Sequence, residues 1–153
     1  RILGVIDRTV AGREGRLVAG GKRVGGAFAN GYFIEPTVFV DVDPASRLAR
    51  EEVFGPVLSV IRFETEDEAV RLANDSEFGL GAYVQTTNLA RAHRLAARLQ
   101  AGYININGFS NMEPAAPFGG YKQSGFGRFG GSAGLDEYLQ NKTVFIAAGA
   151  GPA

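Results

Sequence analysis

The sequence contains no cysteine and only one histidine, His93. Without cysteine, these residues cannot form a disulfide, supply a thiolate nucleophile or bind zinc or an iron–sulfur cluster through sulfur. A single histidine also leaves little room for a histidine-rich metal site or a proton relay. Because His93 lies among arginines in a predicted helix, we interpret it as part of a solvated helix face.

Net charge and long apolar runs are missing as well. Sixteen Lys and Arg residues balance sixteen Asp and Glu residues, so no overall field would attract nucleic acid or an anionic membrane. No apolar run reaches the ~18 residues of a membrane span, and Arg1 does not begin a signal peptide. We therefore expect a cytoplasmic protein with neither nucleic acid nor membrane as a partner.

Glycine, in contrast, is abundant: its 22 residues are about twice the usual share of ~7%. Glycines in short loops are typical of tight turns and of close backbone approach beside ligands. One run, Gly125–Gly130, matches the G-x-G-x-x-G pattern of dinucleotide-binding loops. We reject that interpretation because Lys122–Ser124 is not expected to be a strand and no acidic residue follows ~20 positions later.

Hydrophobic periodicity predicts a mixed α/β chain with parallel strands and flanking helices. Helices are expected from Ile2, behind the capping box Thr65–Glu68, after the cap Asn88 and near Leu135–Tyr138. The expected strands are Leu17–Ala19, residues on one or both sides of Pro36, Val57–Phe63, Ala82–Gln85, Tyr103–Ile106 and Thr143–Ile146. Pro44–Ala49 is expected to be a connection, and Gly102 to end the helix after Asn88. Strand, helix and strand within Ala82–Ile106 form a βαβ unit, which favours parallel pairing.

The segment Glu51–Val57 has two interpretations. In the more frequent one, two solvated acids precede a core phenylalanine and a turn. In the other, a loop presents a carboxylate, Glu52, and an aromatic ring, Phe54, on the same side. A carboxylate can accept hydrogen bonds from both hydroxyls of a ribose, and a ring can pack against a flat heterocycle.

The loop Asn107–Phe118 is also open to two interpretations. It carries large apolar residues beside polar ones, as pocket walls in α/β proteins often do. It could equally be a surface loop that apolar side chains fix in place.

Seven motifs follow one another along nearly the whole chain. They are Gly31–Phe39, Glu51–Val57, Ala73-Asn74 with Phe78–Leu80, Ala101–Asn107, Pro117–Gly125, Gly127-Arg128, and Tyr138 with Lys142. In this order, these segments together resemble the C-terminal part of the NAD(P)-dependent aldehyde dehydrogenase superfamily.

This resemblance implies specific roles. Glu52 corresponds to the glutamate that binds the nicotinamide-ribose hydroxyls of NAD or NADP, and Phe54 to the ring beside the nicotinamide. Ser110, Met112 and Phe118 correspond to positions that line the aldehyde tunnel. Thr143–Ile146 corresponds to a strand that joins a sheet of another subunit, which implies a homo-oligomer, a dimer or a tetramer.

The resemblance also implies that the catalytic residues lie upstream of Arg1. Family members use a cysteine nucleophile, a glutamate base and an oxyanion hole, so no residue of this chain is expected to be catalytic or to bind a metal. A start inside a helix, without a cap, likewise suggests a fragment. Residues 1–139 would be a partial catalytic domain, and residues 140–153 the oligomerisation strand and a flexible tail.

The expected activity of the full-length protein is oxidation of an aldehyde to a carboxylic acid with NAD+ or NADP+. The apolar tunnel suggests an uncharged, moderately hydrophobic aldehyde, and the composition suggests a bacterial source. The chain alone should be inactive. The alternative is a stand-alone binding or assembly module of the same fold. One departure is Phe129, where many relatives have a glutamate that can help to relay protons.

Overall fold

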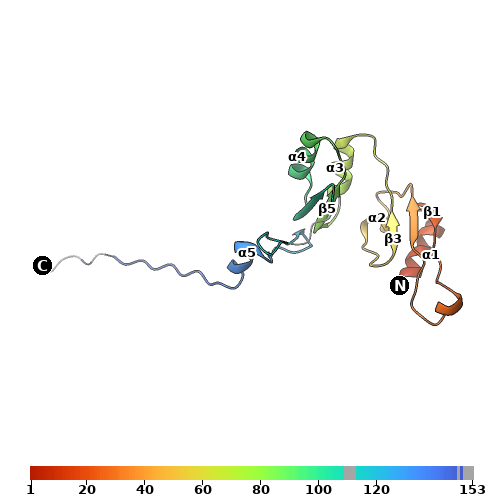
Figure 1. Ribbon diagram of the computed structural model, residues 1–153, viewed down its shortest axis with the longest axis horizontal. Coiled ribbons are helices and arrows are strands. Elements are labelled where there is room, and N and C mark those ends of the chain that lie inside the picture. Colours follow the sequence, from red (N-terminus) through yellow and green to blue (C-terminus); the bar gives the residue numbers. More distant parts are fainter. Residues whose placement is uncertain (109–112, 148, 150–153) are drawn as a thin grey trace. The chain divides into compact units, whose positions relative to one another are not determined.

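The computed structural model describes residues 1–108, 113–147 and 149 (Figure 1). The chain divides into two compact units, Arg1–Glu77 and Phe78–Ala153. This division lies inside the predicted partial catalytic domain 1–139. Within the described ranges, none of the helices has both the length and the apolar character needed to cross a bilayer.

The first unit combines helices with a three-stranded sheet. Its elements are α1 (Ile2–Gly12), β1 (Arg16–Ala19), the 3-10 helix η1 (Gly26–Phe28), β2 (Thr37–Val40), α2 (Arg47–Arg50), β3 (Val57–Ser59) and α3 (Glu66–Asn74). β2 is the central strand, antiparallel to β1 and parallel to β3. Of the two pairings in this sheet, that of β2 with β3 is therefore parallel.

The core of this unit lies between α1, β2 and α2. Ile6 of α1, Phe39 of β2 and Leu48 of α2 are buried together with Val42, and Phe39 is completely inaccessible to solvent. Burial of each such side chain stabilises the fold by roughly 1.5–3 kcal/mol. This cluster fixes α2, and with it the loop that follows α2.

A predicted cap begins α3. The Thr65 hydroxyl accepts a hydrogen bond from the Glu68 backbone N–H at 3.1 Å, as the capping box requires. The Glu68 carboxylate, however, accepts from the N–H of Glu64 at 2.8 Å. In a standard capping box this carboxylate would accept from the N–H of the cap residue, Thr65. Here it accepts from the residue before the cap.

The second unit contains the predicted βαβ unit. Its elements are β4 (Phe78–Gly79), β5 (Gly81–Val84), α4 (Leu89–Arg98), β6 (Tyr103–Ile106), β7 (Tyr121–Lys122) and α5 (Gly131–Asp136). β5 and β6 are parallel, with Gly81 opposite Tyr103 and Val84 opposite Ile106. Asn88 caps α4 as predicted, because its side-chain oxygen accepts from the Arg91 N–H at 2.9 Å.

Gly102 does not end α4, contrary to the prediction. The helix ends at Arg98, and the extended residue Leu99 is its C-cap. Gly102 is instead required by a close approach, since a Cβ there would overlap the carbonyl oxygen of Gly119. The glycine lets the loop before β7 lie against the start of β6.

Other predicted elements differ from the observed ones. Thr143–Ile146 is not a strand: among the described residues it has no ladder partner, and a strand without a partner leaves its backbone groups unpaired. Residues 47–50, within and just after the expected connection, form α2, because the Ser46 hydroxyl caps it. Only the residues after Pro36 form a strand, β3 is shorter than predicted, and α5 begins before Leu135.

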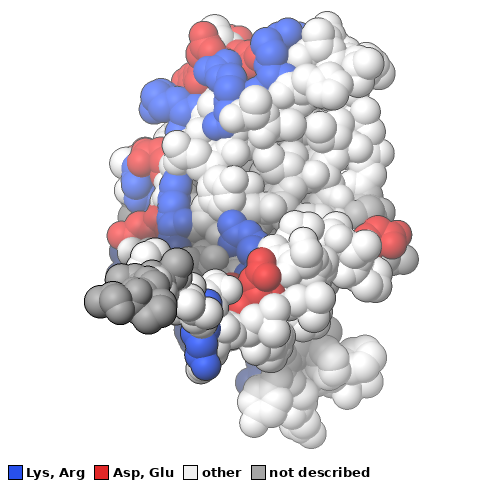
Figure 2. Space-filling view, turned by 90° about the vertical axis from the view of Figure 1, so that its left-hand side faces the viewer, with Lys and Arg blue, Asp and Glu red and all other residues white. Residues whose placement is uncertain are grey.

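Charged side chains are mixed on the surface. On the face that Figure 2 shows, Lys and Arg side chains lie beside Asp and Glu side chains. No large region of one sign is visible there, in keeping with the equal numbers of acidic and basic residues.

Candidate functional site

The loop between α2 and β3 carries Glu52 and Phe54. The Ser46 hydroxyl accepts from the Ala49 N–H at 3.2 Å and thereby begins α2. At the other end of the loop, the Pro56 carbonyl accepts from the Thr37 N–H at 2.8 Å. Both ends of the loop are thus attached to elements of the first unit.

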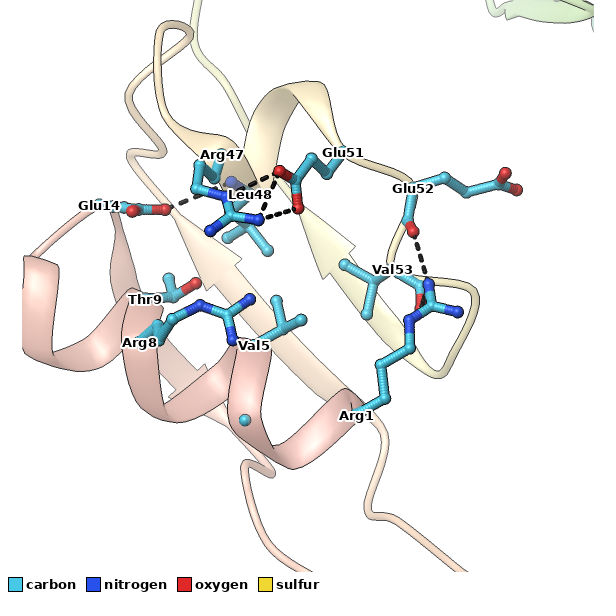
Figure 3. Close-up of a pocket in the computed structure, with 11 residues that line it drawn as sticks. Arg1, Val5, Arg8, Thr9, Glu14, Arg47, Leu48, Glu51, Glu52 and Val53 are labelled. Carbon is cyan, nitrogen blue, oxygen red and sulfur yellow. Dashed lines mark hydrogen bonds and ion pairs between the residues drawn. The ribbon is translucent and has the colours of Figure 1, made fainter.

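The two neighbouring glutamates have different surroundings (Figure 3). Arg47 donates to both carboxylate oxygens of Glu51, at 2.7 and 2.9 Å. The Glu52 side chain points away from this pair, and its carboxylate has no hydrogen bond or ion pair within the described part of the chain. Of the two carboxylates, Glu52 is therefore the one that is free to bind a ligand.

Arg1 holds the backbone of the same loop. One nitrogen of its guanidinium, Nη2, donates to the carbonyl oxygens of Glu52 and Val53, at 3.0 and 2.9 Å. Val53 also packs against the core of the unit. The backbone around Glu52 is thus supported from the beginning of α1 and from the core.

Phe54 adopts an unusual backbone conformation. Its φ is 54°, in the left-handed region that residues with a Cβ rarely adopt. Its side chain is 77% exposed, so burial does not compensate for that conformation. Strained residues of this kind gather at binding sites, where the surrounding structure determines their position.

A hollow of about 480 Å³ includes both predicted cofactor residues. It is lined by Leu48, Glu51, Glu52, Val53, Phe54, Gly55, Val57 and Ser59. A second hollow, of about 340 Å³, lies between α1 and α2 and includes Arg1, Arg8 and Arg47 (Figure 3). Both volumes are in the range of small-molecule sites, and only the first contains both Glu52 and Phe54.

The predicted substrate residue Phe118 belongs to the second unit. Its ring meets that of Tyr103 edge to face, with centroids 5.6 Å apart at 70°. Its backbone forms a bridge with Phe129. The other two predicted substrate residues, Ser110 and Met112, lie outside the described residues.

The G-x-G-x-x-G run forms a clamped loop. The Arg128 guanidinium donates to the carbonyl oxygens of Gly120 and Gly127, at 3.0 and 2.8 Å, and lies over the Tyr121 ring. Lys122 belongs to β7, so the expectation that it is not in a strand is wrong. Because β7 is a two-residue antiparallel strand and not part of a βαβ unit, the dinucleotide-loop interpretation still fails.

The pKa of one carboxyl group, that of Asp41, is clearly shifted, and Asp41 is not among the residues that line the hollow with Glu52. Hydrogen bonds and charge from Arg62, together with Arg16, hold the pKa of this carboxyl below its ordinary value. The described residues contain no group of three or more His, Cys, Asp or Glu side chains that could hold a metal.

A family comparison decides the identity of the chain. The model of the aldehyde dehydrogenase family matches residues 1–144. The chain belongs to the aldehyde dehydrogenase family. The resemblance predicted from the sequence motifs is thereby confirmed, and the mixed α/β structure with parallel strands is a part of the family's fold.

Individual relatives agree with the family comparison. The chain is 48% identical over 149 residues to betaine aldehyde dehydrogenase of Cereibacter sphaeroides, which covers 97% of this chain and 30% of that protein. It is 48% identical over 134 residues to the NADP/NAD-dependent aldehyde dehydrogenase PuuC of Escherichia coli, covering 88% of this chain and 26% of that protein. The crystal structure of Mycobacterium tuberculosis aldehyde dehydrogenase complexed with NAD+ matches with a TM-score of 0.89 and 40% identity, covering 98% of this chain and 30% of that one. This chain therefore spans about a third or less of the length of these relatives.

Some features of the site could not be found from the sequence. The contact of Arg1 joins residues about fifty positions apart, which no local pattern indicates. The pair of Arg47 with Glu51 does have a local signal that could have found it, the i, i+4 spacing. The positive φ of Phe54 has no sequence signal.

Proposed function

We propose that this chain is the C-terminal portion of an aldehyde dehydrogenase that oxidises an aldehyde to a carboxylic acid with NAD+ or NADP+. The observation that carries the proposal is that the free Glu52 carboxylate and the exposed Phe54 residue line one hollow, on a loop within the residues that the family model matches. Related proteins are described as complexed with NAD+ or as NADP/NAD-dependent.

In this proposal the Glu52 carboxylate accepts hydrogen bonds from the two hydroxyls of the nicotinamide ribose. An ionised carboxylate has two oxygens and only acceptor capacity, which suits a diol donor. Because the Glu52 carboxylate has no hydrogen bond or ion pair within the described ranges, ribose binding would not have to break one. The Arg1 contacts would keep the loop in place while the cofactor binds.

Phe54 lies two residues further on and packs beside the nicotinamide ring. Its exposed face offers apolar area to a flat heterocycle. The hollow that both residues line gives the ribose and the ring a common position. When bound, the nicotinamide ring would accept the hydride.

Phe118, Ser110 and Met112 are proposed from the family resemblance to line the aldehyde site, and of the three the structure describes Phe118. A thiolate nucleophile must come from outside these residues, because the sequence has no cysteine. The chain alone is accordingly proposed to be inactive, and its role is to form walls of the cofactor and aldehyde sites.

We further propose a homo-oligomer formed through Thr143–Ile146. Phe145 is 89% and Ile146 84% exposed, and the segment has no strand partner among the described residues. Pairing with a sheet of another subunit would satisfy its backbone and cover its apolar side chains.

The first experiment is the intact mass of the polypeptide that the native host makes. A species several times heavier than 16.2 kDa, whose purified form makes NADH or NADPH from an aldehyde panel, supports the proposal. A native species of 16.2 kDa, or a heavier one that reduces neither cofactor with any aldehyde, contradicts it.

A further inference from the structure

Phe118 and Phe129 form a cross-strand pair in the second unit. Each backbone N–H donates to the carbonyl oxygen of the other residue, and both distances are 2.7 Å. Side chains of directly opposed residues in an antiparallel bridge lie on the same face, with Cβ atoms about 4.5–5.5 Å apart. The Phe129 side chain therefore begins next to that of Phe118.

The two rings differ in their surroundings. Phe118 is half-buried, and the Tyr103 ring of β6 packs against it edge to face. Phe129 is 74% exposed. Phe118 thus connects the bridge to the body of the unit, while Phe129 extends the same apolar face outward.

The position of Phe129 is held by its neighbour Arg128. The Arg128 backbone N–H donates to the Glu137 carboxylate at 3.2 Å, and its guanidinium donates to the Gly120 and Gly127 carbonyls. With the bridge to Phe118, these contacts hold the backbone of Arg128 and Phe129. A side chain held in this way can contribute to a binding site without an ordering cost for its backbone.

We propose that Phe129 is a specificity-determining residue that extends the apolar wall begun by Phe118. This inference rests on the proposed function, in which Phe118 lines the aldehyde site. A phenylalanine brings a large apolar ring and no charge to this position. The pair of rings favours aldehydes with an aromatic or long aliphatic chain over short ones.

The test compares Phe129→Ala with the wild type in the full-length enzyme, using phenylacetaldehyde, octanal and acetaldehyde. The variant should raise KM about tenfold for the two large aldehydes, with kcat changed less than twofold, and leave acetaldehyde within twofold. Phe126→Ala is the matched control, because Phe126 is 97% exposed in the same loop and should change no KM.

An equal change for all three aldehydes, or no change for any, would overturn the inference. If Phe129→Ala does not fold, Phe129→Leu decides the question: it should weaken phenylacetaldehyde more than octanal, and an unchanged ratio contradicts the proposal. A wild-type enzyme that oxidises none of these three aldehydes but oxidises another aldehyde of the panel rejects the role of Phe129, whereas one that oxidises no aldehyde of the panel rejects the proposed function itself. An active wild type with an unchanged ranking in the variant rejects the role of Phe129 alone.

Discussion

Arg47 binds Glu51 through two hydrogen bonds, of 2.7 and 2.9 Å, and leaves the adjacent Glu52 carboxylate without a partner in the described part of the chain. Two acids that are adjacent in the sequence therefore have different surroundings in the structure. Glu51 secures the end of α2, where an exposed i, i+4 pair contributes at most a few tenths of a kcal/mol.

This difference predicts the effect of two matched substitutions in the full-length enzyme. Glu52→Gln should weaken NAD+ binding about tenfold and slow hydride transfer, because an amide is a poorer acceptor for two ribose hydroxyls than a carboxylate. Glu51→Gln should leave both quantities within twofold. Titration of cofactor fluorescence and single-turnover kinetics measure them. Equal effects of the two variants would remove Glu52 from the cofactor site.

Arg1 is expected to act through the loop that it holds. Arg1→Ala removes two charge-assisted hydrogen bonds to the Glu52 and Val53 carbonyls, so the amides of residues 52–54 should exchange about ten times faster with deuterium. Arg1→Lys keeps the charge and should restore part of the protection. Amide exchange of this loop, compared with that of β2, measures the effect. Protection that stays unchanged in Arg1→Ala contradicts the role.

Gly102 is expected to tolerate no side chain. A Cβ there would overlap the carbonyl oxygen of Gly119, and backbone cannot move aside as a flexible side chain can. Gly102→Ala should therefore destabilise the protein by about 2 kcal/mol or more. Gly108→Ala is the control, because a Cβ at Gly108 meets nothing within 4 Å. Urea unfolding monitored by circular dichroism measures both, and equal stabilities of the two variants would refute the close-packing argument.

The lowered pKa of Asp41 predicts how the free energy of unfolding depends on pH. Arg62 and Arg16 lower its pKa in the folded state, so its contribution to stability is present above the unfolded pKa of about 3.9. That contribution is lost as the pH falls through the lower, folded pKa. Asp41→Asn should thus be less stable than the wild type at neutral pH and equally stable in strong acid. The difference should be small and should shrink with salt, since the group is exposed. Thermal unfolding at both pH values measures it, and a difference that grows in acid would contradict the sign.

The parts of the fold that sequence reasoning predicted correctly rest on local signals. The caps Thr65 and Asn88 each bind an N–H three residues ahead, and the apolar stripe behind each cap continues the helix. The parallel pairing of β5 and β6 follows from the helix that connects them.

The missed features depend on residues far apart in the chain. The strands β4 and β7 have two residues each, and they exist because Phe78 pairs with Lys122, forty-four positions away. The β-branched and aromatic residues of Thr143–Ile146 fit a strand, but a strand requires a partner, and the described residues of this chain supply none. Its pairing with another subunit stays a proposal. In the candidate site, Glu52 and Phe54 are proposed from residue type and family resemblance, while the contact of Arg1 with the Glu52 and Val53 carbonyls is non-local.

The approach of Gly102 to Gly119 has an evolutionary consequence. Among the described residues of the second unit, Ala92 is the only buried hydrophobic side chain, and backbone lies against backbone where larger side chains would otherwise meet. In the first unit, a change in the volume of Leu48 can be balanced by a neighbour such as Val42. At Gly102, the neighbour is the backbone of Gly119, and no substitution of a side chain can make room in a backbone. Under drift, the first unit is therefore expected to exchange its core residues freely, and the second to keep its glycines.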